Sequence, residues 1–142
     1  CRSFLGYTAH VVEVTVTKEG YVSVDRVWCS IDSGTIVSPD RVYAQVEGAV
    51  IMGISQAMFG EMPMKNGKAV HSNFDGFRVA RMTDAPQEIN IDIIRSDAAP
   101  GGVGETGIGS FAPALCNAIF AATGKRVRDL PIKNHDLSWT NQ

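Results

Sequence analysis

Residues 10–32, HVVEVTVTKEGYVSVDRVWCSID, decide the fold class because they carry the clearest extended pattern in the chain. Apolar and polar residues alternate around Val12, Val14 and Val16, which is typical of a half-buried strand. A second run rich in β-branched and aromatic residues follows, and residues 18–20 between the two runs fit a short turn with glycine at the bend. We therefore expect a β-hairpin, and with it a sheet on which the rest of the chain packs.

The segment after this hairpin predicts a long helix over residues 39–59. Ser38 followed by Pro39 resembles an N-cap and a first helical position, because proline lacks the N–H group that would be unsatisfied there. Apolar residues then recur every three or four positions and form one broad stripe. Gly48 and Gly53 each cost such a helix about 1 kcal/mol relative to alanine, so we expect another part of the backbone to approach closely there.

The second half of the chain adds shorter elements. Asn66-Gly67 predicts a hairpin turn between short strands, and residues 74–87 show no clean period and are expected to be irregular. Residues 88–96 alternate as a half-buried strand does, and residues 110–123 are small and apolar, as in a second helix. Gly124 stands at the usual C-terminal position of that helix.

These elements predict an α+β fold, with two main helices, about 39–59 and 110–123, packed on a mixed and mostly antiparallel sheet. A length of 142 residues with 44% hydrophobic and 20% charged residues suits one globular domain spanning residues 1–142. The net charge of -2, without a run of Lys and Arg, argues against a nucleic-acid partner.

Several other classes of function lack support in the sequence. The three cysteines and three histidines have no metal-ligand spacing, so we expect no metal bound by side chains. The longest apolar run is far shorter than the roughly 20 residues that span a bilayer. The chain begins without Met and shows no targeting segment, so we expect part of a longer protein and assign it neither to the cytoplasm nor to the periplasm.

Residues 101–110, GGVGETGIGS, contain a formal G-x-G-x-x-G from Gly102 to Gly107. A dinucleotide fingerprint needs a strand directly before its glycines and an acidic residue about 20 positions further on, in a second parallel strand. Here the preceding strand is expected to end near Arg95, and Asp129 follows a loop. Nucleotide binding is therefore a minor alternative.

Glu105 stands at the centre of this loop, and two interpretations of it are open. A carboxylate among glycines is most often a solvated loop residue. The five surrounding glycines instead suggest a backbone course that other residues cannot take, in a loop that approaches a ligand. A carboxylate at the centre of such a loop is placed for general-base catalysis. Gln45 poses a similar choice between an exposed glutamine and an amide that contacts a heterocycle edge.

Three separated motifs give the chain a family resemblance. They are DSGTIVSPDRVYAQVEGAVIMGISQAMFGEM at residues 32–62, GGVGETG at residues 101–107 and APALCNAIFAATGKRVRDLPI at residues 112–132. In this order and spacing they resemble the C-terminal, molybdopterin-binding part of the large, molybdenum-binding subunit of the xanthine oxidase and aldehyde oxidase family. The branch of the isoquinoline 1-oxidoreductase beta subunit is the most similar, and the resemblance covers roughly residues 11–132.

The resemblance implies a molybdenum hydroxylase that oxidises an aldehyde or N-heteroaromatic substrate with water as the oxygen source. By motif match, Glu105 is the general base and Gln45 hydrogen-bonds the pyranopterin. The backbone at Val103 and Gly104 is expected close to the ligands of the metal. The implied cofactor is a molybdenum-pyranopterin, in its cytosine dinucleotide form, bound only in the complete enzyme. The implied partners are the remainder of the large subunit and a small subunit that carries iron–sulfur clusters.

The sequence also departs from the family pattern. Proline usually follows the GVGE motif, whereas Thr106 stands here, so we expect a less rigid loop. A non-catalytic structural or assembly module that retains the same fold is the alternative function.

Overall fold

The fold is built on a four-stranded mixed sheet. The structure, a computed structural model, describes residues 1–73 and 75–139. The strand order is β1-β2-β3-β6, with β1 (Arg2–Ser3), β2 (Gly6–Val16), β3 (Val22–Asp32) and β6 (Glu88–Ile93). The first three strands pair antiparallel, and β6 pairs parallel to β3. The predicted hairpin is therefore confirmed, and the sheet is mixed and mostly antiparallel as expected.

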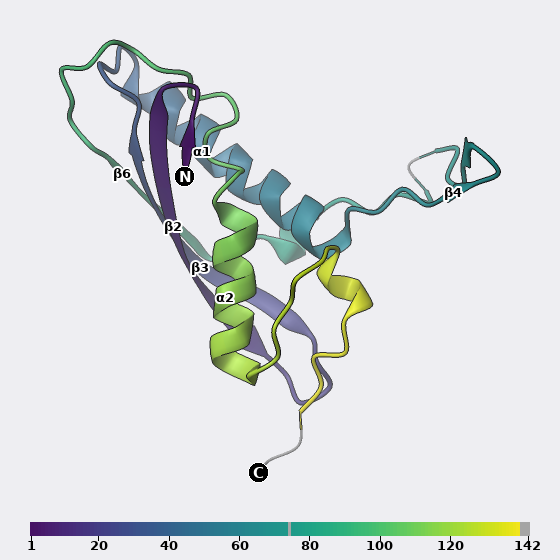
Figure 1. Cartoon of the computed structure of the whole chain (residues 1–142). Helices are drawn as coiled ribbons and strands as arrows, with labels where there is room; N and C mark the ends of the chain where they lie inside the picture. The colour runs from purple at the N-terminus through teal and green to yellow at the C-terminus, as the bar shows by residue number, and fades with distance from the viewer. Residues whose placement is uncertain (74, 140–142) are drawn as a thin grey trace.

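Two helices, α1 (Pro39–Ile54) and α2 (Phe111–Thr123), pack against this sheet (Figure 1). The main apolar cluster contains residues from β2, β3 and both helices, among them the fully buried Val27, Val50 and Phe111. The short 3-10 helix η3 (Ile132–Asn134) adds to the same core. The predicted α+β fold class is therefore confirmed.

The first predicted helix has the expected extent but not a uniform geometry. Its last turn is a π-helix, η1 (Ser55–Phe59). A Cβ added at Gly53 would lie 2.7 Å from Cδ1 of Phe111, so the close approach predicted at Gly53 exists, although to a side chain rather than to backbone. A Cβ at Gly48 would meet nothing within 4 Å, so the prediction for Gly48 is wrong. Gly48 lies on the exposed side of α1, and no atom of the described chain comes close to its Cα hydrogens.

The second helix matches its prediction closely. Ser110 occupies the N-cap position, and Pro113 falls in the first turn, where its missing N–H group costs no hydrogen bond. Gly124 ends the helix in the left-handed conformation with φ 72°, and its N–H donates to the carbonyl oxygen of Phe120 at 2.8 Å.

A small hairpin projects away from the sheet and helices (Figure 1). It consists of β4 (Met64–Lys65) and β5 (Lys68–Ala69). Asn66 and Gly67 form its turn with positive φ values of 51° and 75°, as the sequence predicted. The chain from residue 75 to residue 87 is irregular apart from the 3-10 helix η2 (Met82–Asp84), which confirms the prediction there. Residue 74, the first of the predicted irregular segment, lies outside the described residues.

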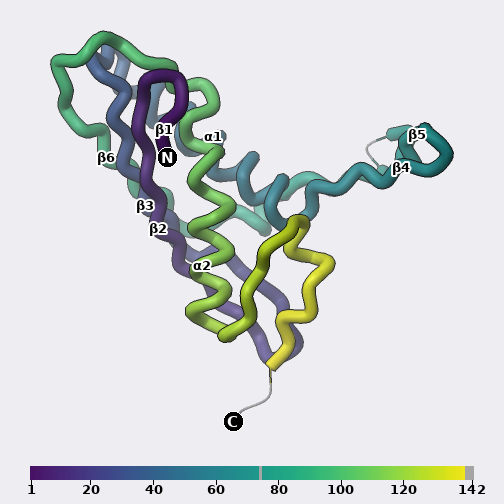
Figure 2. The backbone as a smooth tube through the Cα atoms, in the orientation of Figure 1, coloured from purple at the N-terminus to yellow at the C-terminus, as the bar shows by residue number. Residues whose placement is uncertain are grey.

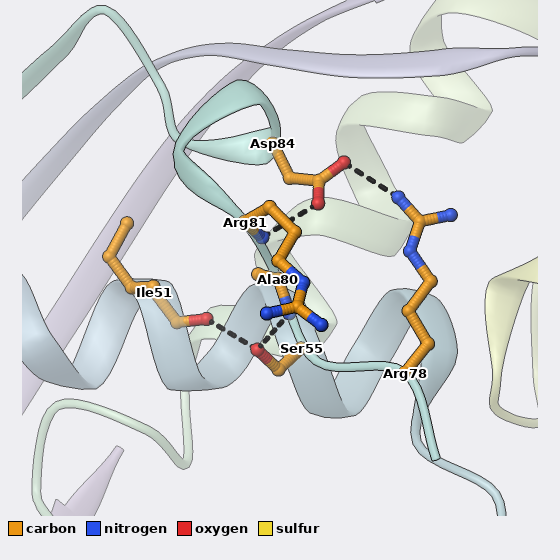
Figure 3. A network of polar contacts seen from close by, with 6 residues as sticks. All are labelled: Ile51, Ser55, Arg78, Ala80, Arg81 and Asp84. Carbon is orange, nitrogen blue, oxygen red and sulfur yellow. Dashed lines mark hydrogen bonds and ion pairs between the residues drawn. The ribbon is translucent and has the colours of Figure 1, made fainter. Parts of the chain in front are cut away.

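After the projecting hairpin, residues 78–84 lie against the C-terminal end of α1 and contact it through Ser55 (Figure 3). The Ser55 hydroxyl donates to the carbonyl oxygen of Ile51 at 3.2 Å and accepts the N–H of Ala80 at 2.9 Å. An ion pair between Arg78 and Asp84, at 2.9 Å, closes the turn that follows. These contacts fix the base of the projecting hairpin.

The chain between β6 and α2 passes around the end of the sheet at which β3 ends (Figure 2). Backbone hydrogen bonds hold it there, beginning with Ile94, whose N–H donates to Ile31 at 2.9 Å. Thr35 donates to Ala98 at 2.9 Å, Gly101 donates to Ser33 at 2.8 Å, and Gly102 donates to Phe4 at 2.8 Å. The start of the glycine-rich loop, residues 101–110, is therefore anchored to the segment between β3 and α1 and to the β1–β2 turn. No helix in the described part of the chain is long and apolar enough to cross a membrane.

Candidate cofactor site

Gln45 and the glycine-rich loop, predicted separately from the sequence, lie in contact. Gln45 stands on an exposed face of α1, and its Nε2 donates to the carbonyl oxygen of Gly104 at 2.7 Å. The two residues are 59 positions apart in the chain. The carbonyl oxygen of the Gln45 amide has no partner among the described residues, so it is available to an external group.

A cavity of about 590 Å³ lies beside this contact. Its wall consists of residues 35–38, the first turns of α1 including Arg41 and Gln45, and Pro100, Gly101, Val103 and Gly104. Its size falls within the range of pockets that hold cofactors and drug-sized ligands. Arg41 contributes a positive charge, which suits the anionic phosphate of a pyranopterin cofactor.

Gly104 differs from the other glycines of the loop. A Cβ at Gly104 would meet nothing within 4 Å, so no part of the described chain requires glycine there. The Cβ atoms built at Gly101, Gly102 and Gly107 would instead lie 3.0, 2.9 and 2.9 Å from Phe4 or Ala49. Three of the five glycines therefore serve packing, and Gly104 alone combines a place on the cavity wall with open space above its backbone.

The loop glycines do not adopt the conformation that the sequence suggested. The described glycines with positive φ are at positions 20, 34, 67 and 124, so none lies in residues 101–110. The expectation that this loop follows a course closed to other residues therefore holds at Gly101, Gly102 and Gly107, but because of crowding and not because of a positive φ. Glycine is needed at those three positions because atoms of the β1–β2 turn, the start of β2 and α1 leave no room for a side chain.

Val103 fixes the loop on the inner side. Its side chain is partly buried and packs against the apolar cluster that contains Ile31 of β3 and Val42 and Val46 of α1. Its backbone lines the cavity next to Gly104. The two backbone positions that the sequence assigned to the cofactor thus lie on one wall, together with Gln45.

Glu105 follows directly after this wall and is exposed. Its carboxylate makes no hydrogen bond or ion pair with the described residues, and it is not among the residues that line the cavity. The carbonyl oxygen of Glu105 accepts the N–H of Ile108 at 3.0 Å, which holds the backbone in a turn. Nothing in the described chain therefore competes for the oxygens of this carboxylate.

Thr106 makes hydrogen bonds that restrain the loop, at the position where the missing proline led us to expect a less rigid loop. It is fully buried, and its Oγ1 donates to the carbonyl oxygen of Gly102 at 2.7 Å. Its own carbonyl oxygen accepts the hydroxyl of Thr8, on β2, at 2.9 Å. A threonine at this position therefore restrains the loop by hydrogen bonding instead of by a proline ring.

The nucleotide-binding alternative does not fit this geometry. Residues 94–101 separate the end of β6 from the first glycine of the G-x-G-x-x-G run. Gly107, the last glycine of that run, is buried against Ala49 of α1 and does not face a ligand. Within the described residues no strand follows α2 that could carry Asp129 beside a ribose.

Several residues that line the cavity or contact the loop were not predicted from the sequence. Residues 35–38 and Arg41 line the cavity. Thr8 donates a hydrogen bond to Thr106 in the loop and is itself hydrogen-bonded to Ser110. The signal for Thr8 was present: β2 alternates, so Thr8 lies on the buried face with Gly6 and Val12, where a polar residue needs a partner. No three His, Cys, Asp or Glu side chains of the described chain gather into a group that could hold a metal ion.

Comparisons with known proteins identify the family of this chain. Residues 2–86 match the family of the molybdopterin cofactor-binding domain, a range that includes Gln45 and ends before Glu105. The chain is 38% identical over 137 residues to the isoquinoline 1-oxidoreductase subunit beta of Brevundimonas diminuta, covering 91% of this chain and 17% of that protein. It is 36% identical over 128 residues to the membrane-bound aldehyde dehydrogenase (pyrroloquinoline-quinone) of Gluconacetobacter polyoxogenes, covering 89% of this chain and 16% of that protein.

Among solved structures, the aldehyde oxidoreductase from Desulfovibrio gigas superposes with a TM-score of 0.77 at 26% identity, over 90% of this chain and 15% of that one. The chain thus spans 17% or less of the length of these relatives. The chain belongs to the molybdopterin cofactor-binding domain family, within the xanthine oxidase and aldehyde oxidase group of molybdenum oxidoreductases.

Proposed function

We propose that this chain forms the part of a molybdenum hydroxylase that holds the pyranopterin cofactor and supplies the catalytic base. The substrate class is an aldehyde or an electron-poor N-heterocycle, and water is the source of the oxygen atom. The observation that carries the proposal is the hydrogen bond of 2.7 Å from Gln45 to Gly104, because it joins the predicted pterin contact to the loop of the predicted base.

Each of the named residues has a distinct part in this proposal. Gln45 would bind the pterin through the amide carbonyl oxygen that has no partner in the described chain, and Arg41 would pair with the phosphate. The open backbone at Gly104 admits the cofactor closely, since no side chain projects there. When bound, the molybdenum-pyranopterin supplies the redox and oxygen-transfer chemistry.

Glu105 carries the acid–base part of the reaction. Its carboxylate is exposed and unpaired in the described chain, so nothing competes with a reacting group for its proton-accepting oxygens. Its backbone is held on both sides, at Gly104 by Gln45 and at Thr106 by Thr8. A base that is held in place in this way contributes about 10²–10⁴-fold to a rate.

The finer assignments follow from the branch that the chain resembles. We assign the cofactor to the cytosine dinucleotide form, and we place the iron–sulfur clusters on a separate small subunit. The remainder of the large subunit would complete the cavity, because this chain is a small fraction of the length of its relatives.

Cofactor analysis and isotope labelling of the complete subunit test this function. We expect stoichiometric molybdenum and a pterin in the purified subunit, and oxidation of an aldehyde or N-heterocycle that transfers ¹⁸O from labelled water into the product. A quinone in place of a pterin would contradict the cofactor assignment, a relevant outcome since one relative is named for pyrroloquinoline quinone. A subunit that binds the cofactor but oxidises no member of either substrate class would support the non-catalytic module.

A further inference from the structure

A chain of hydrogen bonds connects the buried face of β2 to the loop that carries Glu105. His10 Nδ1 lies 2.8 Å from the hydroxyl oxygen of Ser110, and that oxygen lies 3.0 Å from Oγ1 of Thr8. Thr8 Oγ1 in turn donates to the carbonyl oxygen of Thr106 at 2.9 Å. The partners are 98 to 102 residues apart in sequence, so these contacts join two distant parts of the chain.

The number of available hydroxyl protons fixes which atom donates and which accepts in each of these hydrogen bonds. A carbonyl oxygen only accepts, so the one hydroxyl proton of Thr8 is used toward Thr106. Thr8 must then accept from Ser110, which uses the one hydroxyl proton of Ser110. Ser110 must therefore accept from His10, and this requires a proton on Nδ1 of His10.

The surroundings of His10 agree with the neutral ring in this form. Its Nε2 is buried without a hydrogen-bond partner in the described chain, and the ring stands edge-on to Phe111 with centroids 5.9 Å apart. A bare Nε2 leaves one acceptor unsatisfied, whereas protonation would bury a charged N–H group there without a partner. Burial lowers the pKa of His10 to about 4.

We propose that His10 is a positioning residue for Glu105, as the first donor of the relay from His10 through Ser110 and Thr8 to Thr106. Because the relay ends on the carbonyl oxygen of Thr106, the residue after Glu105, it restrains the chain on one side of Glu105 while Gln45 restrains the other side through Gly104. The role of the relay in positioning Glu105 rests on the proposed function, whereas the relay itself and the tautomer of His10 do not.

The relay is tested first by the tautomer. In the complete protein labelled with ¹⁵N-histidine, the side-chain resonances that disappear in His10→Asn belong to His10. We expect them to report a neutral ring with the proton on Nδ1 at neutral pH. A ring with the proton on Nε2 would overturn the relay, because Ser110 would then have no donor.

The positioning role is tested with a pair of substitutions. His10→Leu removes the donor at similar volume, whereas the amide nitrogen of His10→Asn can reach the place of Nδ1 and donate. We expect His10→Leu to increase hydrogen exchange in residues 102–110 and to lower kcat between about tenfold and a hundredfold at unchanged molybdenum content. His10→Asn should recover most of both properties, and His71→Asn, on the projecting segment, should change neither.

Equal loss in His10→Leu and His10→Asn, or no loss in His10→Leu, would contradict the positioning role. The exchange and tautomer measurements separate this failure from that of the proposed function. If they agree with the relay but Glu105 is dispensable for turnover, then only the assignment of Glu105 as the base is wrong.

Discussion

Gln45 and Gly104 are joined by a hydrogen bond of 2.7 Å between the amide nitrogen of one and the carbonyl oxygen of the other. This bond crosses from α1 to the loop between β6 and α2. It leaves the amide oxygen of Gln45 available to a ligand and holds the peptide before Glu105. One side chain thus contributes both to the cavity wall and to the position of the proposed base.

Gln45→Ala should lower the cofactor content of the complete enzyme by about five- to tenfold. The substitution removes one hydrogen bond to Gly104 and the proposed contact to the pterin, together worth about 1–1.5 kcal/mol. Molybdenum analysis of the purified protein measures the effect. Gln56→Ala, at an exposed glutamine in η1, is the matched control and should retain full cofactor content. Equal content in the two variants would remove Gln45 from the cofactor site.

Gly104→Ala and Gly107→Ala should have opposite effects. A methyl group at Gly104 meets no described atom within 4 Å, so we expect unchanged stability and reduced cofactor content. At Gly107 the added carbon would lie 2.9 Å from Cβ of Ala49, and such overpacking costs about 1–3 kcal/mol of stability. Denaturant unfolding and molybdenum content, measured on both variants, separate the two roles. Full cofactor content in Gly104→Ala would show that the open side of Gly104 does not face the cofactor.

Much of the fold could be predicted because its signals are local. Alternation at Val12, Val14 and Val16, the Ser38-Pro39 pair and the Asn66-Gly67 dipeptide each act over a few residues, and each corresponds to an observed element. The parallel pairing of β6 with β3 has no such signal, because it joins residues such as Val27 and Ile89 that are far apart in sequence. The π-helical turn at residues 55–59 likewise depends on packing with the rest of the molecule.

The site was predictable only where a motif covers it. Gln45 and Glu105 belong to motifs, and the structure brings their segments together. His10 and Ser110 carry no motif, and their contact spans 100 residues, so only the folded chain reveals it. The glycines of the loop were found, but the reason for three of them was not, because crowding by Phe4 and Ala49 leaves no trace in the local sequence.

Thr106→Val should loosen the loop without disturbing the core. Valine keeps nearly the same volume at this fully buried position but cannot donate to Gly102, which costs about 1 kcal/mol. We expect faster hydrogen exchange in residues 102–106 and reduced turnover. Thr106→Ser retains the hydroxyl and should exchange as the parent protein does. If Thr106→Val exchanges at the same rate as the parent protein, the hydrogen bond from Thr106 to Gly102 does not restrain the loop in the way that the usual proline would.

Stability should fall as the pH falls from about 6.5 to about 4, with a contribution from His10. The pKa of His10 is lowered from its ordinary value of 6.5 to about 4, so in this range the unfolded chain takes up a proton that the folded chain does not. The stabilisation is complete above pH 6.5, and the loss is on the order of 1–2 kcal/mol after allowance for partial solvent exposure. Urea unfolding at pH 7.5 and pH 5 measures it. His10→Asn should show a shallower pH dependence, and an equal dependence would assign the effect to other groups.

The most direct test of the central claim is the rate of substrate oxidation by Glu105→Gln in the complete, cofactor-loaded enzyme. The amide keeps the shape of the side chain but cannot act as a base, so we expect kcat to fall by about 10²–10⁴-fold while molybdenum and pterin content stay at the parent level. Asp97→Asn, which alters another exposed carboxylate in the segment between β6 and α2, should leave the rate unchanged. A rate near that of the parent enzyme in Glu105→Gln would return Glu105 to the role of a solvated loop residue and contradict the account.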